Sequence, residues 1–275
     1  MIEYSKERQE KGIEMAYSAL AEKQYDNIVP FSIVMGTKDV KPKSPKAREN
    51  HGGGRVAGQS SEVYAFRTEE EIKDMIDMYN KHIEEAPDAH HRQIAARNKL
   101  LFVVGINVGL RASDLATLKW SFFLDITADG KYRFKDFYVL QPKKTRKTKK
   151  FVKLFFNNTV KKAIVEYLNE YPTDNLDEYL FASREGGAIS TKTLYRAVKN
   201  TAKEVGIKQN IGSHSLRKSW AFHVWRNAKD KDRALVMLMR CFNHSSTAVT
   251  MRYIGIMDDE IKDVYESVEL GFDFI

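Results

Sequence analysis

Cysteine is almost missing from this chain, since Cys241 is the single one among 275 residues. One thiol cannot form an internal disulfide, and we expect Cys241 to be a small buried hydrophobe in a reducing compartment. Long apolar runs are missing too, because the longest, residues 100–106, is far too short to span a membrane. The N-terminus has no apolar stretch typical of a secretory signal. These absences argue against disulfide-stapled and membrane-spanning classes and predict a cytoplasmic protein.

Metal-binding motifs are also lacking. The sequence has no HExxH, no paired CxxC and no cluster of aspartates, so we expect neither a metal nor another cofactor. Positive charge, in contrast, is in excess: 45 Lys and Arg residues stand against 37 Asp and Glu residues, a net charge of +8. The hydrophobic share of 43% indicates a globular chain. The excess of cations suggests a polyanionic partner.

Composition divides the chain into three parts. Residues 1–37 are expected to form an N-terminal helical segment. Residues 38–65 are rich in Lys, Pro, Gly and Ser without periodicity, which is typical of a flexible basic linker. Residues 66–275 carry regular helix and strand patterns and are expected to form the folded domain.

The folded domain is predicted to be mainly α-helical. Its first helix begins at a capping box, because Thr68 is followed three residues later by Glu71. A helix at about 91–108 follows and is expected to end at Gly109. A third helix is expected to begin near Ser113 and to carry Leu115, Leu118 and Trp120. The remaining helices are expected at 158–170, 190–205, 213–228, 231–240, 246–254 and 258–269.

Two alternating, aromatic-rich runs interrupt the helices. Residues 132–142 and 149–156 have the pattern of strands, and the polar stretch between them predicts a hairpin. The fold class is therefore mainly α with a small antiparallel β-sheet, an α+β domain.

The turn of this hairpin is strongly basic. Residues 143–153, KKTRKTKKFVK, hold seven cationic side chains. Most runs of this kind are solvated surface turns. A turn anchored between two apolar strands can also press into a phosphate backbone, and a lysine at the strand end can donate a proton there.

Two further segments place arginines near helix starts. In GSHSLRKSW, Ser213 can cap a helix and leaves His214 and Arg217 on one face of its first turn, where free amides and a guanidinium attract phosphate oxygens. In GINVGLRASDL, Arg111 follows a helix terminator at a buried junction and needs an anion. A salt bridge to Asp114 is one solution, and a bound phosphate with Asp114 behind it is the other.

The stretch FNHSSTAVTMRYI, residues 242–254, holds a histidine and a tyrosine nine residues apart. In one helix, nine steps of about 100° would put His244 and Tyr253 on opposite faces. They can share a site only if the chain turns between them, and Ser245 and Ser246 supply a helix N-cap. We therefore expect His244 just outside a helix and Tyr253 near the end of that helix.

Together, these segments resemble the tyrosine recombinases, also called phage-type integrases, and most closely the small members that are mostly catalytic domain. The matching segments are GLRASDLATL around Arg111, the basic hairpin with Lys144, HSLRKSWAFH with His214 and Arg217, and FNHSSTAVTMRYIGI with His244 and Tyr253. The step from His244 to Tyr253 agrees with the family's usual spacing. The resemblance covers about residues 66–275 and implies the tyrosine recombinase catalytic-domain fold there. It departs at the N-terminus, where many members carry a core-binding domain of several helices.

The resemblance implies a site-specific DNA recombinase that cleaves and rejoins strands through a 3′-phosphotyrosine intermediate. The implied roles are nucleophile for Tyr253, phosphate binding for Arg111 and Arg217, proton donor to the 5′-oxygen for Lys144, proton acceptor for His214, phosphate hydrogen bonding for His244 and orientation of the site for Asp114. Lys143 or Lys147 are alternatives to Lys144. The expected DNA contacts are Lys143, Arg146, Lys147, Lys149, Lys150, Lys41, Lys43 and Lys46.

The implied reaction is also consistent with general chemistry, without reference to the family. A phenol has a pKa near 10, so it needs neighbouring cations to act as a nucleophile at neutral pH. A phosphotyrosine bond conserves the energy of the phosphodiester, so strands can be rejoined without ATP. Two arginines and a lysine supply the positive charge that a metal would otherwise bring.

The implied partners are double-stranded DNA, further copies of the chain in a dimer or tetramer on DNA, and an accessory DNA-bending or directionality factor, in the nucleoid. Three alternatives stay open: a type IB topoisomerase, a catalytically idle DNA-binding protein of the same fold, and a basic helical binding module. The tail after the tyrosine has an apolar face, made by Ile261, Val264, Tyr265 and Val268. We expect this face to pack on the protein's own core, with docking on a neighbouring protomer as the alternative.

Overall fold

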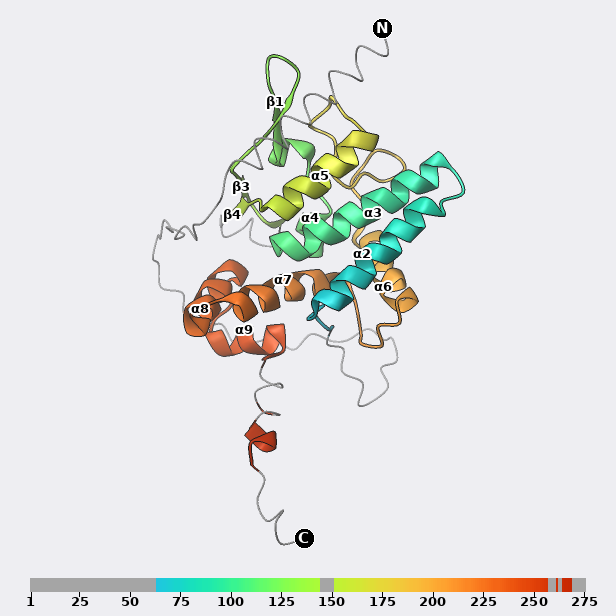
Figure 1. Ribbon diagram of the computed structural model, residues 1–275. Helices are drawn as coiled ribbons and strands as arrows, with labels where there is room; N and C mark the ends of the chain where they lie inside the picture. The colour runs from blue at the N-terminus through green and yellow to red at the C-terminus, as the bar shows by residue number, and fades with distance from the viewer. Residues whose placement is uncertain (1–62, 144–150, 257–260, 262–263, 269–275) are drawn as a thin grey trace, which may run out of the picture.

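A computed structural model describes residues 63–143, 151–256, 261 and 264–268 of the chain. The N-terminal segment 1–37, the linker up to residue 62, and the turn that carries Lys144 lie outside the described residues. Helices dominate the described part, and two small antiparallel sheets lie beside them (Figure 1). The expected fold class is therefore confirmed, with two sheets in place of one.

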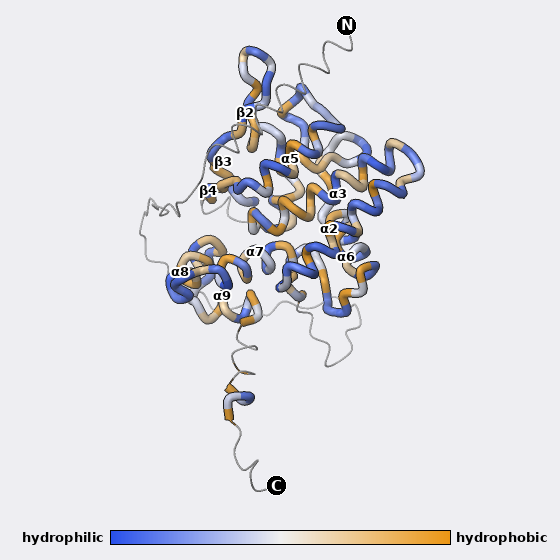
Figure 2. Tube along the Cα trace, in the orientation of Figure 1, coloured by the Kyte–Doolittle hydropathy of each residue, from blue (hydrophilic) through white to orange (hydrophobic). Residues whose placement is uncertain are grey.

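Two long helices, α2 (Glu69–Glu84) and α3 (Ala89–Val108), pack against each other. The capping box at the start of α2 is confirmed, because the Thr68 hydroxyl accepts the Glu71 amide at 3.1 Å and the Glu71 carboxylate accepts the Thr68 amide at 3.2 Å. As expected, α3 ends at Gly109 in the left-handed conformation. The second half of α3 is apolar and buried almost all round, and it crosses the centre of the molecule (Figure 2). The helices that pack around it are α2, α5 (Asn158–Glu170), α6 (Thr191–Glu204) and α7 (Ser213–Asn227).

The third expected helix is much shorter than predicted. α4 (Ala112–Leu115) is a single turn, and a 3-10 helix, η1 (Trp120–Phe122), follows it. Between them the chain pairs with a distant segment: the Leu118 carbonyl accepts the Leu180 amide, and the Trp120 amide donates to the Glu178 carbonyl. This tertiary pairing ends the helix, although the apolar spacing would have allowed it to continue.

Four short strands form two antiparallel pairs. β1 (Leu124–Ile126) pairs with β2 (Tyr132–Phe134), and β3 (Phe137–Leu140) pairs with β4 (Val152–Phe155). The predicted run 132–142 therefore divides into strands of two different sheets. The predicted basic hairpin is β3–β4, and its register pairs Leu140 with Val152 at the end next to the turn.

Five helices complete the described fold. Their bounds agree with the predictions to within about two residues: α5 (Asn158–Glu170), α6 (Thr191–Glu204), α7 (Ser213–Asn227), α8 (Lys231–Phe242) and α9 (Thr247–Ile254). The prediction that Ser213 caps α7 is wrong, because Gly212 is the N-cap and Ser213 is the first helical residue. Helix α7 contacts α3, α6, α8 and α9, so it joins the two halves of the domain (Figure 1).

The buried apolar side chains form two clusters. The larger one lies among α2–α7 and the strands, and the smaller one lies among α7, α8, α9 and the residues around Ala65. Cys241 was expected to be buried but is exposed, because its neighbours Leu238 and Phe242 take the inward face of α8. None of the described helices combines the length and apolar character needed to cross a membrane.

The described residues of the tail beyond Met257 are exposed. Ile261, Val264, Tyr265 and Val268 are 51–78% exposed, and the described part of the tail projects away from the helices (Figure 1). The expectation that its apolar face covers the protein's own core is therefore wrong for these four residues.

Candidate active site

Arg111 stands where α3 gives way to α4. Gly109 turns the chain there with a φ of 61°, and a Cβ at this position would lie 2.2 Å from the Trp220 ring of α7. Only glycine therefore allows α7 to approach the end of α3 this closely. Arg111 is half-buried as the N-cap of α4, and its Nη2 donates to the Phe242 carbonyl at 3.4 Å. The arginine predicted from sequence thus faces the end of α8.

Arg217 approaches the same point from α7. It is only 6% exposed, its Nη1 donates to the Gly109 carbonyl at 2.5 Å, and its guanidinium carbon lies 4.0 Å from the centre of the Phe242 ring. Burial lowers the pKa of Arg217 to about 10, with Arg111 adding to the fall and Tyr253 opposing it. Arg217 is therefore still positively charged at neutral pH.

The chain reverses between α8 and α9, as the sequence predicted. Asn243 ends α8 in the left-handed conformation with a φ of 58°, and Ser246 caps α9 by accepting the Val249 amide. His244 therefore lies outside both helices, and Tyr253 lies in the last turn of α9. Their ring centres are 5.4 Å apart, and the Phe242 ring lies 5.1 Å from that of Tyr253.

The Tyr253 hydroxyl is buried and has no hydrogen-bond partner among the described residues. Burial raises the pKa of Tyr253 above its ordinary value, while the positive charges of Arg217 and Arg111 oppose this rise. Although Arg217 is close enough to act on the phenol electrostatically, no donor or acceptor meets full hydrogen-bond geometry at the oxygen. A buried O–H group without a partner is costly, and it is a place where a substrate oxygen fits.

His244 is set up as a neutral imidazole. Burial, followed by the charges of Arg217 and Arg111, lowers the pKa of His244 below its ordinary value. Its Nδ1 lies 3.1 Å from the hydroxyl oxygen of Thr250, which is fully buried on α9. This contact orients the ring and leaves Nε2 available for another partner.

Asp114 accepts a backbone amide, which decides against one of its two expected roles. It is 3% exposed, and its carboxylate accepts the backbone amide of Lys143 at 2.9 Å. No ion pair joins Asp114 to Arg111, two residues that the structure describes. The simple salt bridge is therefore wrong, because a backbone amide at the start of the basic turn takes the carboxylate oxygen.

The structure brings together Arg111, Arg217, His244 and Tyr253, with Asp114 close enough to raise the pKa of Arg217. His214 is exposed in the first turn of α7, one turn before Arg217. Lys143 is exposed at the start of the turn. The other predicted cations lie outside the described residues, namely Lys144, Arg146, Lys147, Lys149, Lys150, Lys41, Lys43 and Lys46.

Sequence reasoning missed two residues that contact the arginines and the histidine of this cluster. Phe242 supplies its carbonyl to one arginine and its ring to the other, and Thr250 contacts His244. Neither residue type indicates such a role by itself. Lys218 was also missed, although it is buried on α7 with its Nζ 5.5 Å from the centre of the Tyr253 ring.

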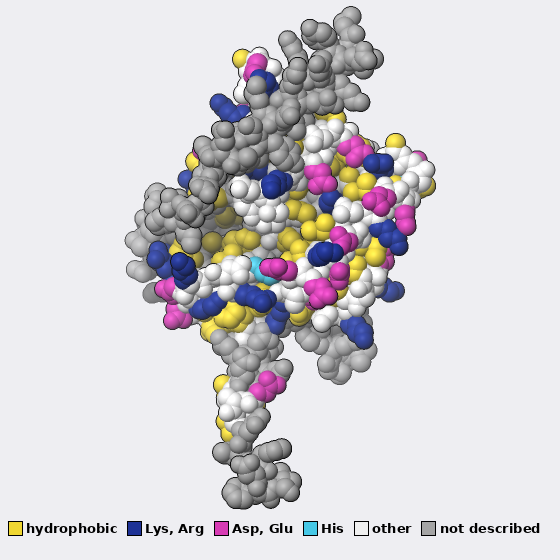
Figure 3. Space-filling model, in the orientation of Figure 1, with side chains coloured by type: hydrophobic (Ala, Val, Ile, Leu, Met, Phe, Trp, Pro, Cys, Tyr) yellow, Lys and Arg dark blue, Asp and Glu magenta, His cyan; other side chains and the backbone are white. Residues whose placement is uncertain are grey.

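Cations also gather on the surface over α7, α8 and α9 (Figure 3). The exposed ones on these helices are Arg226, Lys231, Arg233, Arg240 and Arg252. In the sequence each stands among residues of other kinds, so they do not form a basic run that composition could detect.

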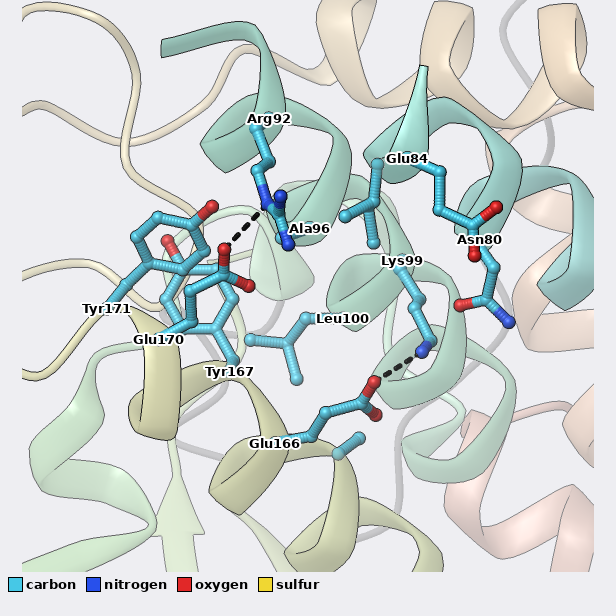
Figure 4. A pocket seen from close by; sticks show the side chains of 12 residues that line it. Asn80, Glu84, Arg92, Ala96, Lys99, Leu100, Glu166, Tyr167, Glu170 and Tyr171 are labelled. Atoms are coloured by element: carbon cyan, nitrogen blue, oxygen red, sulfur yellow. Dashed lines mark hydrogen bonds and ion pairs between the residues drawn. The ribbon is translucent and has the colours of Figure 1, made fainter. Parts of the chain in front are cut away.

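A pocket of about 250 Å³ between α2, α3 and α5 lies apart from the arginine–tyrosine cluster (Figure 4). Four of its five charged side chains form ion pairs, since Arg92 pairs with Glu170 at 2.7 Å and Lys99 pairs with Glu166 at 2.5 Å. None of the predicted site residues lines it. The described residues also contain no group of three or more His, Cys, Asp or Glu side chains placed to hold a metal ion.

Comparisons with known proteins agree on one family. Residues 66–260 match the phage integrase family. The probable integrase/recombinase YoeC of Bacillus subtilis is 34% identical over 171 residues, which cover 62% of this chain and 83% of that protein. The tyrosine recombinase XerD of Oceanobacillus iheyensis is 23% identical over 190 residues, which cover 64% of this chain and 55% of that protein.

Solved structures show the same fold. The crystal structure of XerA recombinase has a TM-score of 0.52 at 21% identity, covering 78% of this chain and 66% of that one. XerH site-specific recombinase, bound to a palindromic difH substrate in a post-cleavage complex, has a TM-score of 0.52 at 19% identity, covering 76% and 55%. The chain thus spans only about half to two thirds of the length of these longer proteins. Its fold is that of the tyrosine recombinases. By the match over residues 66–260, the chain belongs to the phage integrase family.

Proposed function

We propose that this chain is a DNA strand transferase that performs site-specific recombination through a 3′-phosphotyrosine intermediate. The observation that carries the proposal is the convergence of Arg111, Arg217 and His244 on the buried, unpaired hydroxyl of Tyr253. Such an arrangement suits one negatively charged tetrahedral group, and membership of the family indicates a DNA phosphate. The other partners proposed are further copies of the chain on the DNA and an accessory DNA-bending or directionality factor in the nucleoid.

In the proposed reaction, the phenolic oxygen of Tyr253 attacks the scissile phosphorus, and the bond from phosphorus to the 5′-oxygen breaks. The phenol proton passes to His214, and the departing 5′-oxygen takes a proton from Lys144. The 3′-phosphate is then bonded to Tyr253. A 5′-hydroxyl of another strand reverses the same steps, so one phosphoester replaces another and no energy source is consumed.

The remaining residues stabilise charge in this scheme. Arg111 and Arg217 bind the non-bridging oxygens, on which negative charge grows in the transition state. The lowered pKa of His244 keeps its ring neutral, and in the tautomer in which Nδ1 accepts from the Thr250 hydroxyl, Nε2–H donates one hydrogen bond to the phosphate. Asp114 holds the Lys143 amide and so supports the turn in which Lys144 follows. The other cations of the turn and linker bind the DNA backbone.

Tyr253→Phe should abolish the covalent adduct and leave DNA affinity nearly unchanged, because the ring still packs on Phe242 while the attacking oxygen is gone. The measurement uses a nicked suicide substrate, which traps the intermediate, followed by denaturing electrophoresis. Tyr265→Phe is the matched control, since that tyrosine is 78% exposed in the tail. An adduct that survives in Tyr253→Phe would move the nucleophile elsewhere, and a wild-type protein that binds DNA without any adduct would indicate a catalytically idle member.

A further inference from the structure

Arg67 joins the entry of the chain into the domain to the end of the nucleophile helix. Its Nη2 donates to the Gly255 carbonyl at 2.8 Å, a contact between residues 188 positions apart. Gly255 ends α9 in the left-handed conformation, two residues after Tyr253. The approach is close enough that a Cβ at Gly255 would lie 2.8 Å from the same Nη2.

Arg67 is itself held from several directions. Its backbone amide donates to the Glu71 carboxylate at 2.7 Å, and its carbonyl accepts from Arg226 Nη1 at 2.9 Å. Its guanidinium carbon lies 5.3 Å from the ring centre of Tyr64 and 5.1 Å from that of Phe222. A side chain anchored in this way is preorganised to hold the carbonyl that it binds.

The segment before Arg67 packs along α7. The Tyr64 amide donates to the Asn210 carbonyl, the Phe66 amide donates to the Ser219 hydroxyl at 2.7 Å, and His223 contacts the Phe66 carbonyl at 3.0 Å. Ala65 lies in the same small apolar cluster as Ile254 and Ile256 from the end of α9. The entry segment and the end of the nucleophile helix therefore form one packed unit.

We infer that Arg67 is a positioning residue for Tyr253. α9 has only eight residues, and the cap at Ser246 holds its first end. Arg67 holds its last end, so that the phenol stays beside Arg217 and His244. The inference deepens the proposed function, because it assigns to Arg67 the alignment of the proposed nucleophile.

The test compares Arg67→Gln with Arg67→Lys and with the matched control Arg196→Gln. The control makes the same change of charge at an exposed arginine of α6. Three quantities are measured: the rate of adduct formation at saturating DNA, the DNA affinity, and hydrogen–deuterium exchange in peptides that cover α9. We expect Arg67→Gln to slow adduct formation at least about tenfold, because small displacements of a reacting group carry large rate costs.

In Arg67→Gln, exchange at the end of α9 should also rise, while DNA affinity and the other helices stay as in the wild type. Arg67→Lys should recover part of both effects, and Arg196→Gln should show neither. Unchanged exchange in α9, or an equal effect in Arg196→Gln, would overturn the inference. If no variant and no wild-type protein forms an adduct, but exchange rises in Arg67→Gln alone, the proposed function fails and the contact of Arg67 with α9 stands.

Discussion

At the scale of single residues, one apolar residue, Phe242, contacts both arginines of the site. Phe242 presents its carbonyl to Arg111 and its ring to Arg217, and the same ring packs against Tyr253. The positive charges of Arg217 and Arg111 thus lie beside the Tyr253 phenol. Each charge opposes the rise that burial causes in the pKa of Tyr253, and each adds to the fall in the pKa of His244. Since burial also lowers the pKa of His244, the effect of each arginine is measured by the change in that pKa when the arginine is removed.

Arg111→Gln should raise the pKa of His244 towards its ordinary value, because one of the two charges that disfavour the imidazolium is removed while burial persists. The pKa of His244 is measured from the NMR chemical shifts of its ring nitrogens, followed over the pH range in which histidine titrates. Arg240→Gln, which removes an exposed arginine of α8, is the control. An unchanged pKa would show that Arg111 does not act on His244. In the wild type, His244 binds its proton less readily when folded than when unfolded, so its contribution to stability is lost as the pH falls below the ordinary value.

At the scale of elements, helix ends were predictable from sequence where one local signal decided them. A cap needs only residues within one turn of the helix. The start of α2 was therefore predictable from Thr68 and Glu71, the end of α3 from Gly109, and the start of α9 from Ser246. α4 was not predictable in length, since its end depends on pairing with residues near Leu180. Arg111, Arg217, His244 and Tyr253 were found by their order, whereas the roles of Phe242 and Arg67 needed contacts that link distant parts of the chain.

The tail is the element whose packing the sequence did not settle. The four apolar side chains that the structure describes there, Ile261, Val264, Tyr265 and Val268, are exposed, which favours the alternative of docking on a neighbouring protomer. A chain stopped after Met257 should therefore stay folded and still form the covalent adduct, but fail to assemble the paired-site complex in gel-shift or sedimentation measurements. A large drop in melting temperature would show instead that the tail stabilises its own domain.

At the scale of the molecule, α7 connects a large core to the small cluster that carries α8 and α9. The proposed site lies where they meet, since Arg111 belongs to the end of α3 and Tyr253 to α9. Exposed cations also lie over α7, α8 and α9 (Figure 3). DNA binding is therefore expected to draw on charges from several parts of the chain.

Removal of residues 38–61 should flatten the plot of log affinity against log salt, because this stretch carries six cations against two acids. Affinities for matched and unrelated DNA should fall by similar factors, since phosphate contacts carry no sequence information. A deletion that keeps the wild-type slope would show that the linker does not touch DNA. The comparison requires titrations of both proteins over the same range of salt.

The unpaired hydroxyl of Tyr253 has a thermodynamic consequence for the free protein. A buried O–H without a partner, together with two guanidinium groups held near each other, is a local conflict that the surrounding packing must outweigh. A bound phosphate would resolve it by supplying an acceptor and a negative charge together. Folding and binding are then linked, because a phosphate that binds only the folded domain would raise its free energy of unfolding.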